Sequence, residues 1–235
     1  MTVLLILLTL ILFLAADRVV ESRRRQTQPV PGGQVARPRL AADAGFRLPA
    51  DVRLAWNHTW VRFDPASGVS TLGVDDFLGR LVGSPSAVAL PRPGDILHGD
   101  VRPVRLGTGE KTISLALPLQ GEVLETNGSV QEDPALIRRD PYGEGWLIRM
   151  RGRWEDGRAV VHGRAAAAWL REETDRIIGL LAGTEPAPAL VAIQDGGLPS
   201  EGILRDFGPE IWKSFEETLA ARPRARAGEG TEGRS

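Results

Sequence analysis

Hydrophobic and polar residues follow two periodicities along the chain, and the change between them falls near residue 160. Between about 52 and 150, short segments alternate hydrophobic and polar residues and are separated by Gly, Pro and Asp, among them VRLAWNHTWVRF, GVSTLGV, ISLAL and GWLIRM. Alternation with a period of two is the pattern of half-buried β-strands. The stretch VDDFLGRLVG within this region has helical spacing instead. The sequence therefore predicts a mainly β domain with one helical stretch inside it.

After residue 160 the hydrophobic residues recur every three or four positions, as on one face of an α-helix. In GRAAAAWLREETDRIIGLLAG they are Trp169, Leu170, Ile177, Ile178 and Leu181, and in GPEIWKSFEETLAARP they are Ile211, Phe215 and Leu219. Gly183 after the first stretch is a typical helix stop, and Pro209 near the start of the second is a typical helix start. We expect a helical extension over 161–221 whose first helix packs its Trp169 face on the β domain.

The N-terminus has the character of a membrane anchor. Residues 1–16 carry no charge and are mostly Leu and Ile, whereas Arg18 and Arg23–Arg25 come after them. A secretory signal peptide, which is the alternative, would place basic residues before the apolar run and a small-residue cleavage site after it. As a helix this run reaches about 24 Å, and Val19, Val20 and a snorkelling Arg18 supply the rest of a hydrocarbon core about 30 Å thick. We expect a transmembrane anchor over 1–20 that contacts the membrane through residues 3–16.

Basic residues directly after a transmembrane segment favour the cytoplasmic side for the C-terminal part of the chain. The expected protein is thus a bacterial single-pass protein of the inner (cytoplasmic) membrane with its C-terminal domain in the cytoplasm. Residues 21–45 are rich in Arg, Pro, Gly and Gln without periodicity, which predicts a flexible linker. Residues 222–235 hold few apolar residues and are predicted to be a disordered tail. The β domain then spans 46–160.

Composition removes several classes of function. The net charge of −1, without a basic stripe interleaved with aromatics, argues against a nucleic-acid partner. The chain has no cysteine, and its three histidines lie far apart, so the sequence contains neither thiol chemistry nor a metal-binding motif. GTGEKT at 107–112 fails as a phosphate loop because Glu110 separates the glycine from the lysine. Asp75 and Asp76 are adjacent and point apart on a helix, so we expect helix-capping or solvated roles. No catalytic residues emerge, and the protein is not expected to be an enzyme.

Several segments taken together resemble the H protein of the glycine cleavage system, a lipoyl carrier. They are His58-Thr59-Trp60-Val61, LGVDDFLGRLVG at 72–83, LPRPG at 90–94, PLQGEVLETN at 118–127 and DPALIRRDPYGEGWLIRM at 133–150. The last is similar to the family's Pro-x-Leu…Pro-Tyr-Gly-x-Gly-Trp pattern and is the most specific of the five. The anchor, the linker and everything after about 160 lie outside the resemblance.

The resemblance implies a barrel-sandwich hybrid, the fold of lipoyl- and biotinyl-type domains, in which a hairpin presents the lipoyl-lysine. The residues agree with this fold. Ile113, Leu115 and Leu117 alternate with Ser114 and Ala116, so the first three are expected to face the core. The remaining expectations concern the turns: permissive backbone at Gly121 and Gly145, and Tyr142 and Trp146 as core and turn anchors.

The lysine on this hairpin does not occupy the family's position. Counting forward from Gly94 and backward from Pro118, the family's attachment lysine falls at position 110, which is Glu110. Lys111 is one residue later, and a shift of one turns a side chain to the opposite face unless a bulge at Gly109 absorbs it. We therefore expect Lys111 to be a solvent-facing lysine on an unmodified hairpin. The alternative is that Lys111, one of two lysines in the chain, carries lipoate.

These observations leave two functions. The favoured one is a membrane-anchored H-protein-like domain without a prosthetic group, which docks or scaffolds a larger protein complex. The alternative is a working lipoyl carrier for an aminomethyl or related group on Lys111. A periplasmic adaptor of the membrane-fusion type would also join a membrane helix to a lipoyl-like domain. Such adaptors insert a long coiled-coil hairpin, and no heptad run exists between 45 and 160.

Overall fold

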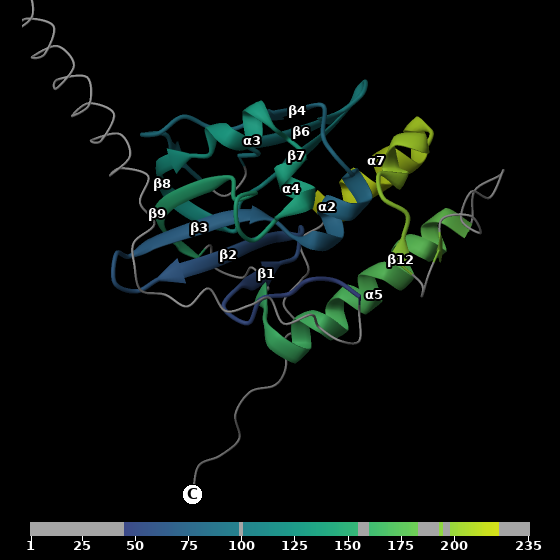
Figure 1. Cartoon of the computed structure of the whole chain (residues 1–235), viewed down its shortest axis with the longest axis horizontal. Coiled ribbons are helices and arrows are strands. Elements are labelled where there is room, and N and C mark those ends of the chain that lie inside the picture. The colour runs from purple at the N-terminus through teal and green to yellow at the C-terminus, as the bar shows by residue number, and fades with distance from the viewer. Residues whose placement is uncertain (1–44, 99–100, 155–159, 183–192, 195–197, 221–235) are drawn as a thin grey trace, which may run out of the picture. The chain divides into compact units, whose positions relative to one another are not determined.

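The structure, a computed structural model, describes residues 45–98, 101–154, 160–182, 193–194 and 198–220 (Figure 1). The predicted anchor over 1–20 and the predicted tail over 222–235 lie outside these ranges. The predicted linker over 21–45 lies outside them too, except for its last residue, Gly45. Within the ranges that are described, no helix has both the length and the apolar character needed to cross a membrane.

Among the described residues, seven strands form the larger sheet, in the order β10–β1–β2–β3–β9–β8–β5, and each neighbouring pair is antiparallel. The strands are β1 (Arg53–Ala55), β2 (Thr59–Asp64), β3 (Val69–Val74), β5 (Ile96–Leu97), β8 (Leu119–Thr126), β9 (Ile148–Trp154) and β10 (Val160–Val161). The register between β8 and β9 shifts between Val123 and Glu125, which places a β-bulge in the longest pair.

The second sheet has three strands in the order β4–β6–β7 and carries the hairpin that the sequence singles out. These strands are β4 (Ala87–Ala89), β6 (Val104–Thr108) and β7 (Lys111–Leu115). Ile113 and Leu115 on β7, and Leu117 just after it, are buried, as their alternation predicts. The mainly β prediction is confirmed.

The described part of the β domain contains three short helices. α2 (Asp76–Val82) falls in the predicted helical stretch, and its N-cap Asp75 accepts a hydrogen bond from the Leu78 backbone N–H at 2.8 Å. α3 (Gly128–Glu132) and α4 (Leu136–Arg139) are five and four residues long. The sequence did not predict these two, because such short segments show no periodicity.

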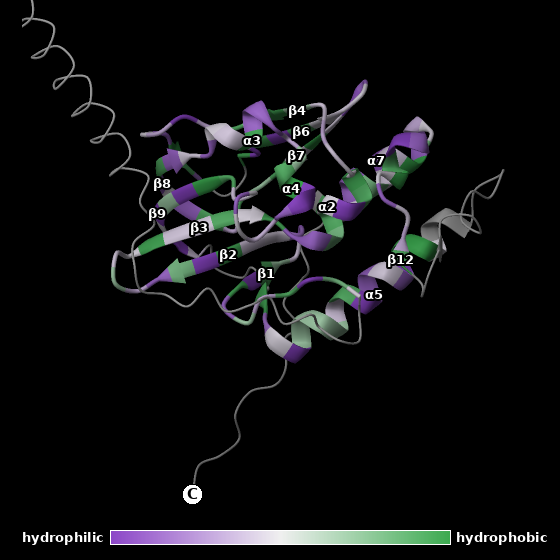
Figure 2. Cartoon of the chain, in the orientation of Figure 1, coloured by the Kyte–Doolittle hydropathy of each residue, from purple (hydrophilic) through white to green (hydrophobic). Residues whose placement is uncertain are grey.

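The extension consists of α5 (Gly163–Ala182), the strand pair β11 (Ile193–Gln194) and β12 (Leu198–Pro199), the 3₁₀ helix η1 (Ile203–Asp206) and α7 (Pro209–Ala220). α5 and α7 lie where the periodicity predicts helices, whereas β11, β12 and η1 were not predicted. Figure 2 shows α7 carrying hydrophobic and hydrophilic residues on different sides, and its Phe215 and Leu219 are buried. On α5, Leu170 and Ile177 are buried in the core.

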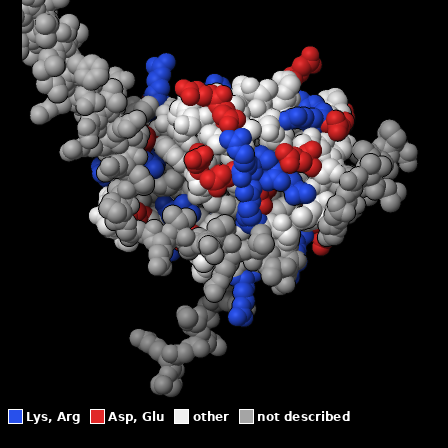
Figure 3. All heavy atoms as spheres, in the orientation of Figure 1, with Lys and Arg blue, Asp and Glu red and all other residues white. Residues whose placement is uncertain are grey.

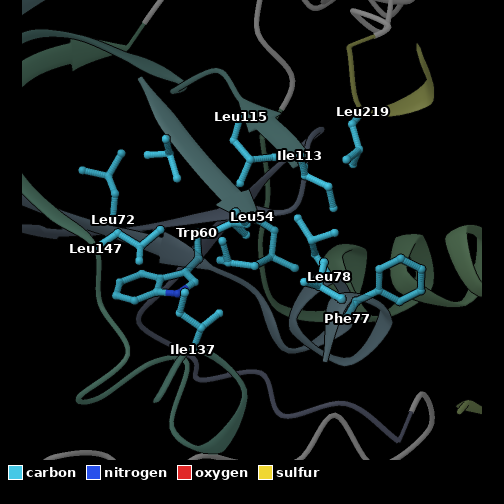
Figure 4. Packing of buried hydrophobic residues seen from close by; sticks show 14 of the residues in the cluster. Leu54, Trp60, Leu72, Phe77, Leu78, Ile113, Leu115, Ile137, Leu147 and Leu219 are labelled. Carbon is cyan, nitrogen blue, oxygen red and sulfur yellow. The ribbon is translucent and has the colours of Figure 1, made fainter. Parts of the chain in front are cut away.

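One core runs through the β domain and the extension. Trp60 is fully buried, and its indole Nε1 donates to the Pro141 carbonyl at 3.0 Å. Figure 4 shows Ile113 and Leu115 of β7 in the same cluster as Trp60 and, from α7, Leu219. The helical extension is therefore packed onto the β domain through apolar side chains, and the burial of their surface stabilises this packing.

The turn before β9 confirms two of the expected anchors. Tyr142 is buried, and its hydroxyl accepts a hydrogen bond from the Asp76 backbone N–H at 3.2 Å. Trp146 is partly buried against the core, with the Arg149 guanidinium 4.3 Å from its ring centroid. Gly145 is required for packing, because a Cβ there would lie 2.5 Å from the Leu136 carbonyl oxygen.

Candidate functional site

The candidate site is the tip of the β6–β7 hairpin. Thr108 pairs with Lys111, and the register runs without a shift to Val104 and Leu115, so Gly109 and Glu110 form a two-residue turn. Gly109 has a φ of 66°, which fits the first position of a type II′ turn, where glycine is favoured. Both turn residues are exposed. The hairpin is regular, without the bulge at Gly109 that could have returned Lys111 to the family's register.

Lys111 belongs to the same face of β7 as the buried Ile113, because residues two apart on a strand point the same way. Its side chain is directed to the C-terminal extension. The Nζ atom donates to the carbonyl of Arg205 at 2.9 Å, to that of Leu204 at 3.4 Å and to that of Phe207. The same ammonium lies 5.3 Å from the ring centroid of Trp212 on α7.

These contacts satisfy all three donors of one ammonium group. Leu204 and Arg205 are in η1, and Phe207 is its C-cap, so the acceptors belong to the end of a helix where carbonyls lack partners within the helix. A cation is stabilised there by the helix dipole as well. The expectation of a solvent-facing lysine is wrong: Lys111 is half-buried and fastens the extension to the hairpin.

The residues at this tip do not fit a lipoyl group on Lys111 as it stands. Attachment through an amide removes the charge and leaves one N–H in place of three donors. The carbonyls of Leu204, Arg205 and Phe207 would then lose donors, and the arm would have to leave a position that the extension covers. The exposed position at the tip is Glu110, which has no amine.

A second group of polar side chains lies buried between the β domain and α5. The His58 Nδ1 is 2.9 Å from the Asp75 Oδ2, and its Nε2 is 3.9 Å from the Glu173 Oε2. All three side chains are at least nine-tenths buried. The His58 ring is stacked between Phe77 and Trp169, at centroid distances of 4.4 and 4.6 Å.

Sequence reasoning missed this group because its members come from three separate segments. The expected capping role holds for Asp75, but Asp75 and Asp76 are buried and not solvated. Two signals were present. His58 directly precedes the strand that carries Trp60, and Glu173 is a charged residue on the face of α5 that also holds Leu170 and Ile177. No three His, Asp or Glu side chains among the described residues are arranged to hold a metal ion.

The pKa values of Tyr142 and Asp133 are shifted in opposite directions. Burial and the neighbouring Asp75 carboxylate raise the pKa of the Tyr142 hydroxyl well above its usual value, so this phenol stays neutral in the fold. Asp133 on the surface has a lowered pKa because it accepts a hydrogen bond from the Arg139 side chain.

The two sheets, the hairpin and the covering helices define a lipoyl-type β domain of the barrel-sandwich kind, in agreement with the expected fold class. The chain belongs to the glycine cleavage H-protein family, whose model, described as "Glycine cleavage H-protein", matches residues 52–173. Proteins of this family are lipoyl carriers and not catalysts, which agrees with the interpretation of the chain as a non-enzyme.

Relatives show the same family. The glycine cleavage system H protein of Bacteroides fragilis is 40% identical over 110 residues, which cover 45% of this chain and 82% of that protein. The H protein of Psychrobacter arcticus is 34% identical over 104 residues, or 44% of this chain and 82% of that protein. A crystal structure of an H protein from Mycobacterium marinum superposes with a TM-score of 0.48 at 22% identity, over 53% of this chain and 99% of that one.

Proposed function

We propose that this chain is a membrane-tethered member of the H-protein family that works without a lipoyl group, as a docking or scaffold subunit of a larger protein complex. The observation that carries the proposal is the engagement of Lys111, whose ammonium donates to three carbonyls of the chain's own extension. A carrier needs a free arm at an exposed tip, and the tip of this hairpin presents Gly109 and Glu110.

Whether the hairpin lysine is free or engaged decides if the domain can work as a carrier. An arm that carries a group between active sites must be able to leave its parent domain. Lys111 of this hairpin instead stays bound to the chain's own extension. It contacts η1 through charge-assisted hydrogen bonds and α7 through a cation–π contact. What remains of the carrier is its β domain, whose surface is available to a protein partner. Members of this family work with other proteins of the glycine cleavage system, which supports a protein partner for this one.

The membrane tether rests on the sequence, since residues 1–20 lie outside the described ranges. The support is an uncharged run over 1–16 with arginines after it. Fractionation of cells that express the full chain should place it in the membrane pellet after a carbonate wash, and deletion of 1–20 should move it to the supernatant. A C-terminal reporter should read cytoplasmic. A mature N-terminus that begins after Ala16 would contradict the anchor.

The absence of lipoate is tested by intact mass. The full chain is purified from a lipoate-replete host and is also incubated with lipoate, ATP and a lipoate–protein ligase. The Bacteroides fragilis H protein serves as the positive control. We expect the unmodified mass in both samples. A lipoyl increment that disappears in Lys111→Arg but persists in Lys213→Arg would establish the alternative, a carrier that uses Lys111.

A gain-of-function variant sharpens this test. Glu110→Lys places an amine at the exposed tip, where the family's count puts the attachment lysine, and leaves Lys111 with its carbonyl partners. We expect this variant to accept lipoate under conditions in which the unaltered chain does not. Modification of both proteins to the same extent would show that the engagement of Lys111 does not prevent attachment.

A further inference from the structure

A pocket of about 530 Å³ lies between the segment before β1, α2, α4 and the turn before η1. Its charged lining residues are Arg47, Arg80, Arg138, Arg139, Asp76 and Glu201. Figure 3 shows basic side chains gathered over α2 and α4 in the centre of the visible face, with acidic side chains around them. Four guanidinium groups face two carboxylates, so the lining itself carries two positive charges in excess.

Arg47 and Asp76 form the rigid floor of this pocket. The Arg47 Nε and Nη2 donate to the Asp76 Oδ1 at 3.1 and 2.7 Å, and its Nη1 and Nη2 donate to the carbonyls of Arg139 and Arg138, both at 2.8 Å. Asp76 also accepts from the Arg138 Nη1 at 3.3 Å. The Asp76 carboxylate therefore neutralises the charge of Arg47 and holds the Arg138 side chain in place. It does not neutralise a second arginine of the pocket.

Arg138 and Arg80 carry the positive charge that Asp76 does not neutralise. The Arg138 Nε is buried and has no hydrogen-bond partner. The Glu201 Oε2 lies 3.3 Å from it, an ion pair without the geometry of a hydrogen bond. Arg80 donates through its Nε to the Pro199 carbonyl at 2.6 Å, which fixes the side chain at the pocket. Arg139 contributes less, because Asp133 already accepts from it at 2.8 Å.

We propose that this pocket binds a small phosphate-bearing molecule, with its phosphate held by Arg138 and Arg80. A guanidinium presents paired N–H donors that match phosphate oxygens, and a buried donor without an acceptor gains most from a ligand oxygen. The Glu201 carboxylate pairs with Arg138 and therefore competes with a ligand for this guanidinium. A phosphate dianion carries two negative charges against the one of Glu201, so it can displace this carboxylate. The volume exceeds that of a phosphate ion and is in the range of small-molecule sites, so the pocket has room for the group attached to the phosphate.

This site is separate from the lipoyl-type hairpin. Arg47 and Glu201 lie outside residues 52–173, which match the family model. The pocket is therefore assembled from the family's domain together with segments that flank the matched region on both sides. Its ligand does not depend on whether Lys111 carries a prosthetic group.

The test is calorimetric titration of the full chain in a neutral detergent, at constant ionic strength, with pyrophosphate and inorganic phosphate as probes. We expect saturable binding at one site. Arg138→Gln should weaken it about tenfold or more, because one charge-assisted contact is lost. Arg149→Gln is the matched control, since it removes the same charge from a surface pair with Glu125 outside the pocket, and should leave binding unchanged.

Glu201→Gln separates ligand binding from a purely structural role of the arginines. Glu201 is half-exposed, and its removal takes away the competing carboxylate without altering the floor. Binding should tighten by about threefold to tenfold, as expected for one removed like charge near a partly solvated site. Circular dichroism verifies that each variant is folded. Equal affinities in the wild type, Arg138→Gln and Glu201→Gln overturn the proposal. So does the absence of saturable binding of both probes together with no recruitment of the protein to anionic phospholipid vesicles.

A phosphate can come from a free metabolite or from a lipid headgroup, and a flotation assay distinguishes the two. Vesicles of phosphatidylglycerol and phosphatidylcholine are compared with vesicles of phosphatidylcholine alone, using the chain without residues 1–20 beside the full chain. Recruitment to anionic vesicles that is lost in Arg138→Gln, without binding of pyrophosphate, assigns the phosphate to a lipid. Binding of pyrophosphate with equal recruitment of Arg138→Gln and wild type assigns it to a free molecule.

Discussion

The Nδ1 atom of His58 lies 2.9 Å from the Oδ2 atom of Asp75, and both side chains are buried. The two residues are joined a second time by their backbones, since the Asp75 N–H donates to the His58 carbonyl at 2.9 Å. His58 directly precedes β2, and Asp75 is the N-cap of α2. Their contact therefore connects the beginning of the β2–β3 hairpin to the helix that follows it, and Trp169 of α5 stacks on the same imidazole.

Asp75→Ala should destabilise the domain by roughly 2–4 kcal/mol, because it removes both the cap on the Leu78 N–H and the buried partner of His58. Urea unfolding followed by tryptophan fluorescence measures the change. Asp75→Asn keeps an oxygen acceptor at the cap and is expected to lose less. If the two variants unfold at the same urea concentration as the wild type, the pair contributes nothing to stability.

Trp169→Ala should lower the stability of the whole domain and not of α5 alone. Trp169 is packed against the core and stacks on His58. Its truncation leaves a gap beside the buried imidazole, and we expect the free energy of unfolding to fall by roughly 1–3 kcal/mol. Glu172→Ala, at an exposed position of the same helix, is the control and should stay within about 0.5 kcal/mol of wild type. Removal of residues 163–235 should have a larger effect in the same direction. Unchanged stability of that truncated chain would refute the packing of the extension on the core.

The sequence predicts those parts of the fold that depend on local pattern. The alternation of Ile113 and Leu115 reveals a strand with one buried face, and the spacing of Phe215 and Leu219 reveals a helix with one buried side. The mismatch at the hairpin could be counted as well, because the family's spacing from Gly94 and from Pro118 puts the attachment position at Glu110, one residue before Lys111.

The environment of the site depends on contacts between distant segments, and no local pattern reports these. The acceptors of Lys111 are backbone carbonyls, which every residue carries, so the sequence contains no mark of where its ammonium lies. Glu173 is an ordinary charged residue on a helix until α5 is placed over His58. In the same way, the arginines of the pocket come from three segments and have the pattern of ordinary surface charge.

Tyr142 should make the protein sensitive to alkali. Its pKa in the fold is raised by burial and by the Asp75 carboxylate, whereas in the unfolded chain it is about 10. The folded state therefore binds the phenol proton more tightly than the unfolded chain does. The contribution of Tyr142 to the free energy of unfolding is complete below about pH 10 and is lost as the pH rises beyond that value. We expect the free energy of unfolding to fall above about pH 10 with a steeper slope in the wild type than in Tyr142→Phe. Parallel slopes would contradict the shift.

Gly121→Ala should destabilise the β8–β9 pair, where the backbone cannot accept a side chain. Gly121 has a φ of 149°, and a Cβ at this residue would lie 2.2 Å from the Arg151 carbonyl oxygen. Because that oxygen belongs to the neighbouring strand, the strands must separate, at a cost of roughly 1–3 kcal/mol or more. Gly128→Ala is the control, since a Cβ there meets no atom within 4 Å. Thermal unfolding of both variants decides the point, and equal melting temperatures would show that the sheet adapts freely.

Lys111→Met tests the relationship on which the proposed function rests. Methionine keeps much of the apolar stem and removes the ammonium, so the carbonyls of Leu204, Arg205 and Phe207 lose their shared donor. We expect a loss of roughly 1–3 kcal/mol, the cost of leaving acceptors at a helix end without a partner. Hydrogen exchange should speed up in η1 and α7 and stay unchanged in β2 and β3. Lys213→Met is the matched control, because the Lys213 side chain is 77% exposed and pairs with Glu217 only at 4.0 Å. If both variants behave like the wild type, Lys111 does not hold the extension, and the hairpin is free to carry an arm.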